Sequence, residues 1–100
     1  MKDAVRVHRL LLHAASQLEK EVWADDLVLD VISAGLDLQQ FITTDDINAE
    51  TDVTVDLGWR DAILQAFEIV AAWSADTTAK AAFAIRMDDL RRAAMSGSAS

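Results

Sequence analysis

The residues that most often do chemistry near neutral pH are, in this sequence, two histidines and three pairs of adjacent aspartates. His8 and His13 are five positions apart, so on one helix their side chains point about 140° from each other. They cannot share a metal ion in the way that an i, i+4 pair does. We predict that both are surface or packing residues.

Neighbouring aspartates on a helix diverge by about 100° and do not form the carboxylate dyad that acid–base catalysis uses. The three pairs are Asp25 and Asp26, Asp45 and Asp46, and Asp88 and Asp89. We expect Asp88 to pair instead with Arg91 or Arg92, because these residues are at helical spacing. None of the three pairs predicts a catalytic site.

The stretch from Asp45 to Asp56 has the acidity of a calcium loop but not its pattern. Ile47 and Ala49 occupy ligand positions, and Glu50 replaces the glycine that the turn needs. The chain has no cysteine, which excludes disulfides, thiolate nucleophiles and cysteine-bound zinc. With no glycine-rich phosphate loop and no nucleophile elbow either, we predict no enzyme, no metal and no cofactor.

Charge is strongly segregated along the chain, whose net charge is −8. Between Glu21 and Trp59 there is no lysine or arginine, and the remaining seven acids share the rest of the chain with all nine bases, which leaves +2 there. The segment holds ten acids: Glu21, Asp25, Asp26, Asp30, Asp37, Asp45, Asp46, Glu50, Asp52 and Asp56. Because the pI is near 4.4, we do not expect direct binding to nucleic acid.

Two interpretations of this acidic segment stay open. It is either a solvated face, whose charge pairs with a basic helix inside the fold or across a homodimer, or a surface that docks on a basic partner. Basic surfaces of proteins mostly hold nucleic acid, and aspartates spaced along a helix and a loop imitate a phosphate backbone.

The elements that must position these charges are helical, since the chain has no proline and only three glycines. With 52% apolar residues, residues 1–95 suffice for one domain. A first helix is predicted over residues 3–23. Its apolar face consists of Val7, Leu11, Ala14, Leu18 and Val22. The opposite side is basic and consists of Lys2, Arg6, Arg9, His13 and Lys20.

A second helix is predicted from Asp25 or Asp26 to Gln40 or Phe41. Most of its circumference is apolar: Leu27, Val28, Leu29, Val31, Ile32, Leu36, Leu38 and Phe41. The narrow polar strip that remains consists of Asp26, Asp30 and Asp37. We therefore expect this to be the most buried helix, in which Gly35 marks either close packing or a break.

Residues 43–57 are polar and acidic and predict a long ordered loop. A small hairpin that pairs residues 41–43 with residues 53–55 is the alternative, because Val53, Val55 and Leu57 alternate as in a strand.

A third helix is predicted over residues 58–74, followed by a fourth that Ser74, Asp76 or Thr77 caps. The apolar face of the third consists of Trp59, Ile63, Ala66, Phe67, Val70 and Trp73. The face of the fourth consists of Phe83, Met87, Leu90 and Ala94. We expect an antiparallel pair, brought close by alanines at 66, 71, 72, 79, 81, 82 and 84, and a disordered tail over residues 96–100. The fold class is all-α, a single-core bundle of about four helices.

The tryptophans divide into two groups. Trp59 and Trp73 are predicted to be core residues. Trp23 lies about 100° from the apolar face of the first helix, beside Val5 and Leu12, and is a candidate anchor for a partner or a homodimer.

In its size and in the acidic run from Glu21 to Asp56, the chain resembles the phage-encoded anti-CRISPR proteins. The resemblance implies an inhibitor that docks on a basic, nucleic-acid-binding surface of a partner protein. The predicted partner-binding residues are Trp23, Asp26, Asp30, Asp37, Asp45, Asp46, Glu50, Asp52 and Asp56. The alternative is a structural or antitoxin-like oligomeric protein. Without a leader or a membrane-length apolar run, we expect a cytoplasmic location, in the host if the protein is phage-encoded, and no membrane contact.

Overall fold

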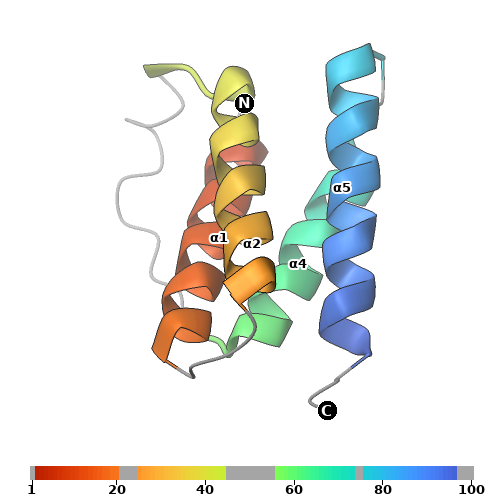
Figure 1. Ribbon diagram of the computed structural model, residues 1–100. Coiled ribbons are helices and arrows are strands. Elements are labelled where there is room, and N and C mark those ends of the chain that lie inside the picture. Colours follow the sequence, from red (N-terminus) through yellow and green to blue (C-terminus); the bar gives the residue numbers. More distant parts are fainter. Residues whose placement is uncertain (1, 21–24, 45–55, 74–75, 97–100) are drawn as a thin grey trace.

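The chain forms an all-α bundle, seen in a computed structural model (Figure 1). The structure describes residues 2–20, 25–44, 56–73 and 76–96. These residues form four α-helices: α1 (Lys2–Lys20), α2 (Asp25–Leu38), α4 (Trp59–Ala71) and α5 (Thr78–Met95). The predicted fold class is confirmed.

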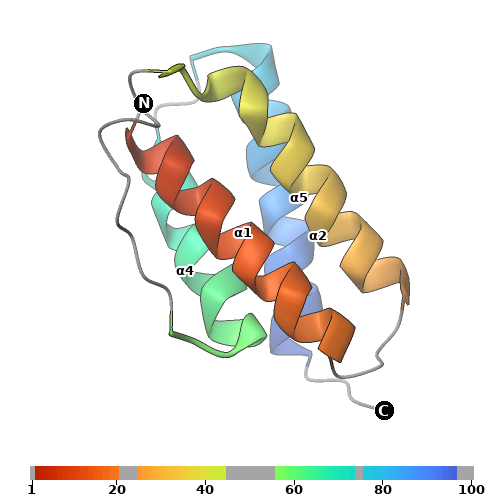
Figure 2. The ribbon, with the colours of Figure 1, turned by 90° about the vertical axis from the view of Figure 1, so that its left-hand side faces the viewer.

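The four helices are arranged in a ring in which each helix contacts two others, and every contacting pair is antiparallel (Figures 1 and 2). The contacts are α1 with α2, α1 with α4, α4 with α5, and α2 with α5. The chain runs in one direction in α1 and α5 and in the other in α2 and α4 (Figures 1 and 2). The end of α2 and the start of α4 therefore lie at opposite ends of the bundle, which explains why a long connection separates them.

The helix α1 supplies the largest share of the core. Its predicted apolar residues Val7, Leu11, Ala14 and Leu18 are all buried. Val5, which shares the side of the helix predicted for Trp23, is buried as well. Residues 21–24, which include the last three residues predicted for this helix, lie outside the described residues.

The prediction that the second helix is the most buried one is wrong. Only its inner side, with Val31, Ala34 and Leu38, is buried, whereas Leu29 and Leu36 are 62% and 60% exposed. One side of α2 faces the core and the rest faces solvent. Many apolar residues of this helix are therefore exposed in spite of its apolar composition. A 3-10 turn, η1 (Gln39–Phe41), then extends α2. This turn excludes a strand over its own residues, and residues 53–55 of the alternative hairpin lie outside the described residues.

Gly35 marks close packing, because α2 continues through it without a break. The ring Nδ1 of His8 on α1 lies 3.2 Å from the Gly35 carbonyl oxygen. A Cβ at this position would lie 3.8 Å from the same nitrogen, in ordinary contact. Gly35 thus packs against His8 of α1, and an alanine would fit at this position as well.

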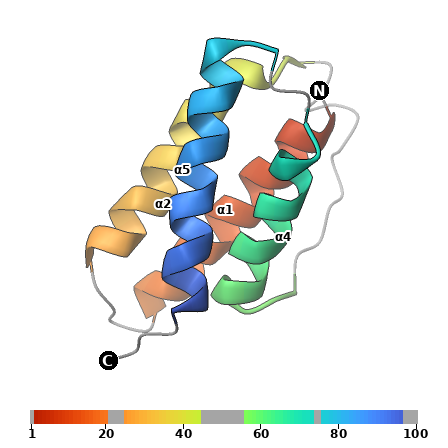
Figure 3. The ribbon, with the colours of Figure 1, turned by 90° about the vertical axis from the view of Figure 1, so that its right-hand side faces the viewer.

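The helices α4 and α5 form the predicted antiparallel pair (Figure 3). Both predicted faces supply buried residues: Trp59, Ile63, Ala66 and Val70 of α4, and Phe83, Met87, Leu90 and Ala94 of α5. Thr77 caps α5 by accepting a hydrogen bond from the Lys80 N–H, at 3.1 Å. The predicted core residues Phe67 and Trp73 are only partly buried and pack against the core.

Three aromatic rings, from different parts of the chain, meet at one end of the bundle. The ring centroids of Phe41, Trp73 and Phe83 are 6.0 to 6.2 Å apart. Two of the ring pairs are edge-to-face and the third is stacked, which are the arrangements that aromatic quadrupoles favour. This cluster ties η1 to α5 and to the residues that follow α4.

Candidate docking face between α2 and α5

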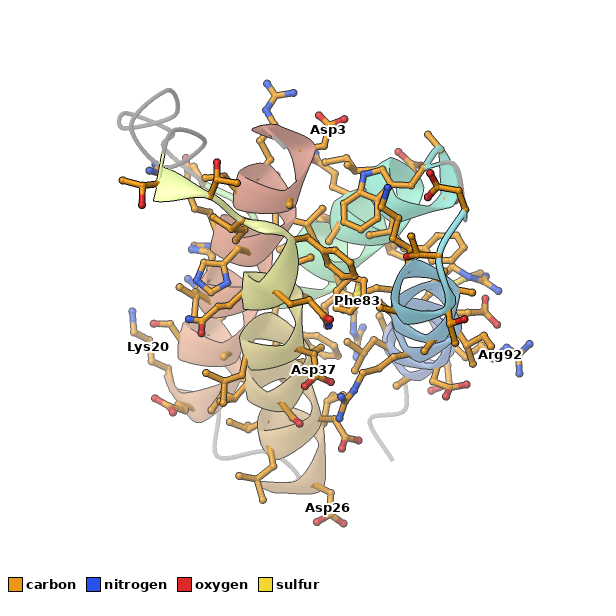
Figure 4. The ribbon with its side chains drawn as sticks, turned by 90° about the horizontal axis from the view of Figure 1, so that it is seen from above. Asp3, Lys20, Asp26, Asp37, Phe83 and Arg92 are labelled. Carbon is orange, nitrogen blue, oxygen red and sulfur yellow. The ribbon has the colours of Figure 1, made fainter. Side chains whose placement is uncertain are left out.

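Three of the predicted partner-binding acids lie on one side of α2. Asp26, Asp30 and Asp37 are spaced by four and seven residues, which places them within a stripe about 40° wide. All three are exposed. In Figure 4, Asp37 lies between α2 and α5, and Asp26 lies at the margin of the molecule. The predicted stripe of acids therefore exists on the surface of α2.

The other predicted partner-binding residues do not extend this stripe. Asp56 is exposed, but it precedes Leu57, whose carbonyl oxygen lies 2.5 Å from the His13 Nε2. His13 points away from the side of α1 on which His8 meets α2, so Asp56 belongs to the α1–α4 side. The other five predicted residues lie outside the described residues: Trp23, Asp45, Asp46, Glu50 and Asp52.

One acid of the stripe is already paired within the fold. Arg86 of α5 donates a hydrogen bond to the Asp37 carboxylate through Nη1 and another to the Ser33 hydroxyl through Nη2, at 2.9 Å. The side chains of Arg86 and Asp37 are 35% and 51% exposed, so this pair contributes at most about 1 kcal/mol. The interpretation that the acids pair inside the fold thus holds for Asp37, with α5 and not the basic side of α1 as the donor.

The Arg86–Asp37 bridge crosses a groove between α2 and α5. On one side of the bridge lies a depression of about 390 Å³, against Ala79, Ala82 and Phe83. On the other side lies one of about 240 Å³, against Leu27, Leu90 and Ala93. Arg86 and Asp89 line both depressions.

The groove exists because the side chains along its α5 wall are short. Ala79, Ala82 and Ala93 line it, and a methyl group does not fill the space between two helices. Ala79 and Ala82 were predicted to bring α4 and α5 together, which is wrong, because they face α2.

One exposed apolar side chain lies beside the groove. Ile85 is 67% exposed and lines the larger depression. Leu29 and Leu36 are also exposed, but they line neither depression and lie on the side of α2 opposite its buried residues. Ile85 is therefore the exposed apolar side chain that the groove offers to a partner.

The histidines serve as structural links. His8 joins α1 to α2 and His13 joins α1 to the segment before α4, which agrees with their prediction as packing residues. In the part of the chain that the structure describes, no three His, Cys, Asp or Glu side chains lie close enough to hold a metal ion. Nor is any described helix both long and apolar enough to cross a membrane.

A third depression, of about 480 Å³, lies between α1 and η1 and is lined by Val5, His8, Arg9 and Leu12 among others. Its Arg9 side chain carries the charge opposite to that of the acidic stripe. The two surfaces therefore suit different ligands, and only the α2–α5 groove is continuous with the predicted acids.

No protein-family model matches the chain, and no curated protein and no solved structure matches it either. A functional assignment therefore has to come from the residues of the α2–α5 face.

Sequence reasoning missed Arg86 and Ile85 as parts of this face, and it missed the exposure of Leu29 and Leu36 on α2. For Leu29 and Leu36 there was a signal, since an apolar arc wider than one helix face leaves part of it in solvent. For Arg86 there was none, because its partner Asp37 is 49 residues away in sequence.

Proposed function

We propose that the protein is a small inhibitor that docks on a basic surface of a partner protein and keeps nucleic acid off that surface. The observation that supports this most is the state of Asp26 and Asp30. Both are exposed, and no ion pair among the described residues involves them. Their charges are therefore available to a partner.

The mechanism is occupancy and not catalysis. Attraction between the acids and lysines or arginines of the partner speeds encounter, and a few desolvated apolar contacts slow release. In its narrowest form the proposal is an anti-CRISPR-type inhibitor, acting in the host cytoplasm, that covers the cations meant for target nucleic acid.

The test compares two double variants that remove the same charge. Asp26→Asn with Asp30→Asn alters the stripe, and Asp61→Asn with Glu68→Gln alters exposed acids of α4. The tagged chain captures partners from nuclease-treated bacterial lysate, and mobility shifts then measure how well each form displaces labelled DNA from a captured partner. We expect the stripe variant to lose about tenfold in potency, since two charge contacts are lost, and the α4 variant to act as the wild type does.

Two results would contradict the proposal. In the first, the captured partner holds DNA equally well with and without the protein. In the second, both double variants lose the same potency, which would mean that net charge and not the α2 stripe is responsible. Affinity should also fall steeply as salt rises, because the contacts are between exposed charges.

A second candidate is a structural, antitoxin-like oligomer, and the exposure of Leu29, Leu36 and Ile85 favours it. An oligomer held by apolar contacts keeps or gains affinity at high salt, whereas the proposed inhibitor loses it. Sedimentation of the chain alone at low and high salt separates the two.

A further inference from the structure

We infer that the α2–α5 groove receives an amphipathic, basic α-helix of the partner protein. This inference rests on the proposed function, because it states which part of a basic partner enters the face and how. Three properties of the groove support it: its length, the spacing of its two depressions, and its charge.

The groove has the length of a short helix. It extends along α2 and η1 from Leu27 to Gln40, which corresponds to about 20 Å of helix. Ala82 and Ala93 line it, and such short side chains let the backbone of a third helix approach closely. A binding helix of about four turns therefore fits.

The two depressions define where the large side chains of that helix go. Phe83 lines one and Leu90 lines the other, and two turns of α5 separate these residues, about 10 Å. The Arg86–Asp37 bridge lies between them. The fitting helix thus carries large apolar residues at i and i+7 and a small residue between them, where it passes over the bridge.

The charge of the walls selects a basic occupant over a second copy of this chain. The walls carry Asp30, Asp37 and Asp89 against Arg86 alone, three negative charges and one positive, which leaves −2. In a two-fold dimer the same face meets itself, so these acids would oppose one another. Lysines or arginines flanking the apolar residues of a foreign helix meet Asp30 and Asp89 instead.

The probe is a labelled synthetic helix of about 18 residues, with leucines at i and i+7, alanine between them and lysines elsewhere. Its control has the same composition, but its leucines are moved to opposite sides of the helix. Fluorescence anisotropy measures the binding of both peptides to the whole chain. We expect the amphipathic peptide to bind at least about tenfold more tightly.

Matched variants of the chain locate the binding site. Ile85→Ala removes the exposed apolar side chain that lines the groove, and Leu12→Ala removes one that is 49% exposed on α1. Because both side chains are exposed and alanine favours helix, circular dichroism should show each variant folded. We expect the groove variant to weaken binding of the amphipathic peptide about tenfold, and Leu12→Ala to leave it unchanged.

The remaining outcomes overturn the inference. If both peptides bind equally and release in salt, the acids act as a flat charged surface, and the proposed function survives without the groove. If neither peptide binds while the chain still displaces DNA from its partner, the partner does not use a helix. If the chain sediments as a dimer that Ile85→Ala dissociates, the face belongs to a second copy.

Discussion

Alanine has opposite effects on the α1–α4 side of the bundle and on the α2–α5 side: it allows close packing on the first and leaves a groove on the second. Ala14 of α1 and Ala66 of α4 are buried within the core, and large side chains such as Ile63 pack around them. Ala82 and Ala93 of α5 instead line a groove. The difference lies in the facing helix, since Asp30 and Asp37 of α2 have to stay hydrated and cannot close onto the alanines. Acidic residues therefore keep this side open.

The largest expected difference in stability is between a variant of a buried residue on the α1–α4 side and a variant of an exposed residue on the α2–α5 side. Ile63→Ala should lower the free energy of unfolding by about 2 to 5 kcal/mol, because a fully buried side chain leaves a cavity. Ile85→Ala, beside the groove, should change it by no more than about 0.5 kcal/mol. Urea unfolding followed by circular dichroism measures both, and equal losses would show that the α2–α5 side is as closely packed as the α1–α4 side.

A smaller difference is expected between two phenylalanines. Phe83 is buried and belongs to the aromatic cluster, so Phe83→Ala should cost about 3 to 5 kcal/mol. Phe67 is partly buried, with the Arg91 guanidinium 4.9 Å from its ring centroid. We expect Phe67→Ala to cost about 1 to 2 kcal/mol. Thermal unfolding measures both variants. A lower melting temperature for Phe67→Ala than for Phe83→Ala would contradict this order.

The smallest effect concerns the bridge across the groove. Arg86→Ala should cost less than about 1 kcal/mol, because its ion pair with Asp37 is exposed. Arg92→Ala is the matched control, since Arg92 pairs with Asp88 within α5 at 2.8 Å. Urea unfolding at low and high salt should give similar, salt-weakened losses for both. A loss for Arg86→Ala as large as that of Ile63→Ala would mean that the bridge, and not the apolar core, holds α2 against α5.

The spacing of apolar residues along the sequence was sufficient to predict much of the fold. The four-residue and three-residue steps of Val7, Leu11 and Ala14 predicted a buried face, and the same steps did so for Phe83 and Met87, because a helix repeats every 3.6 residues. The ion pairs of Asp88 with Arg91 and Arg92 also follow from this period. Such contacts lie within one helix, so no knowledge of the bundle is needed to find them.

The same helical spacing predicted only part of the docking face. The stripe of Asp26, Asp30 and Asp37 could be predicted from the period of one helix. The burial assigned to Leu29 and Leu36 was wrong, because composition alone does not tell how many neighbours a helix has. The groove itself needs α5 opposite α2, and no residue of either helix specifies that pairing.

The residues alone therefore determine the set of helices, their inner faces and the segregation of charge, since each depends on interactions within a few residues of chain. The order of the helices around the bundle decided the rest. It placed Arg86 against Asp37, turned Ala79 and Ala82 toward α2, and left acids and the exposed Ile85 around one groove. These contacts join residues far apart in sequence, and the packing of the whole core determines which of them meet.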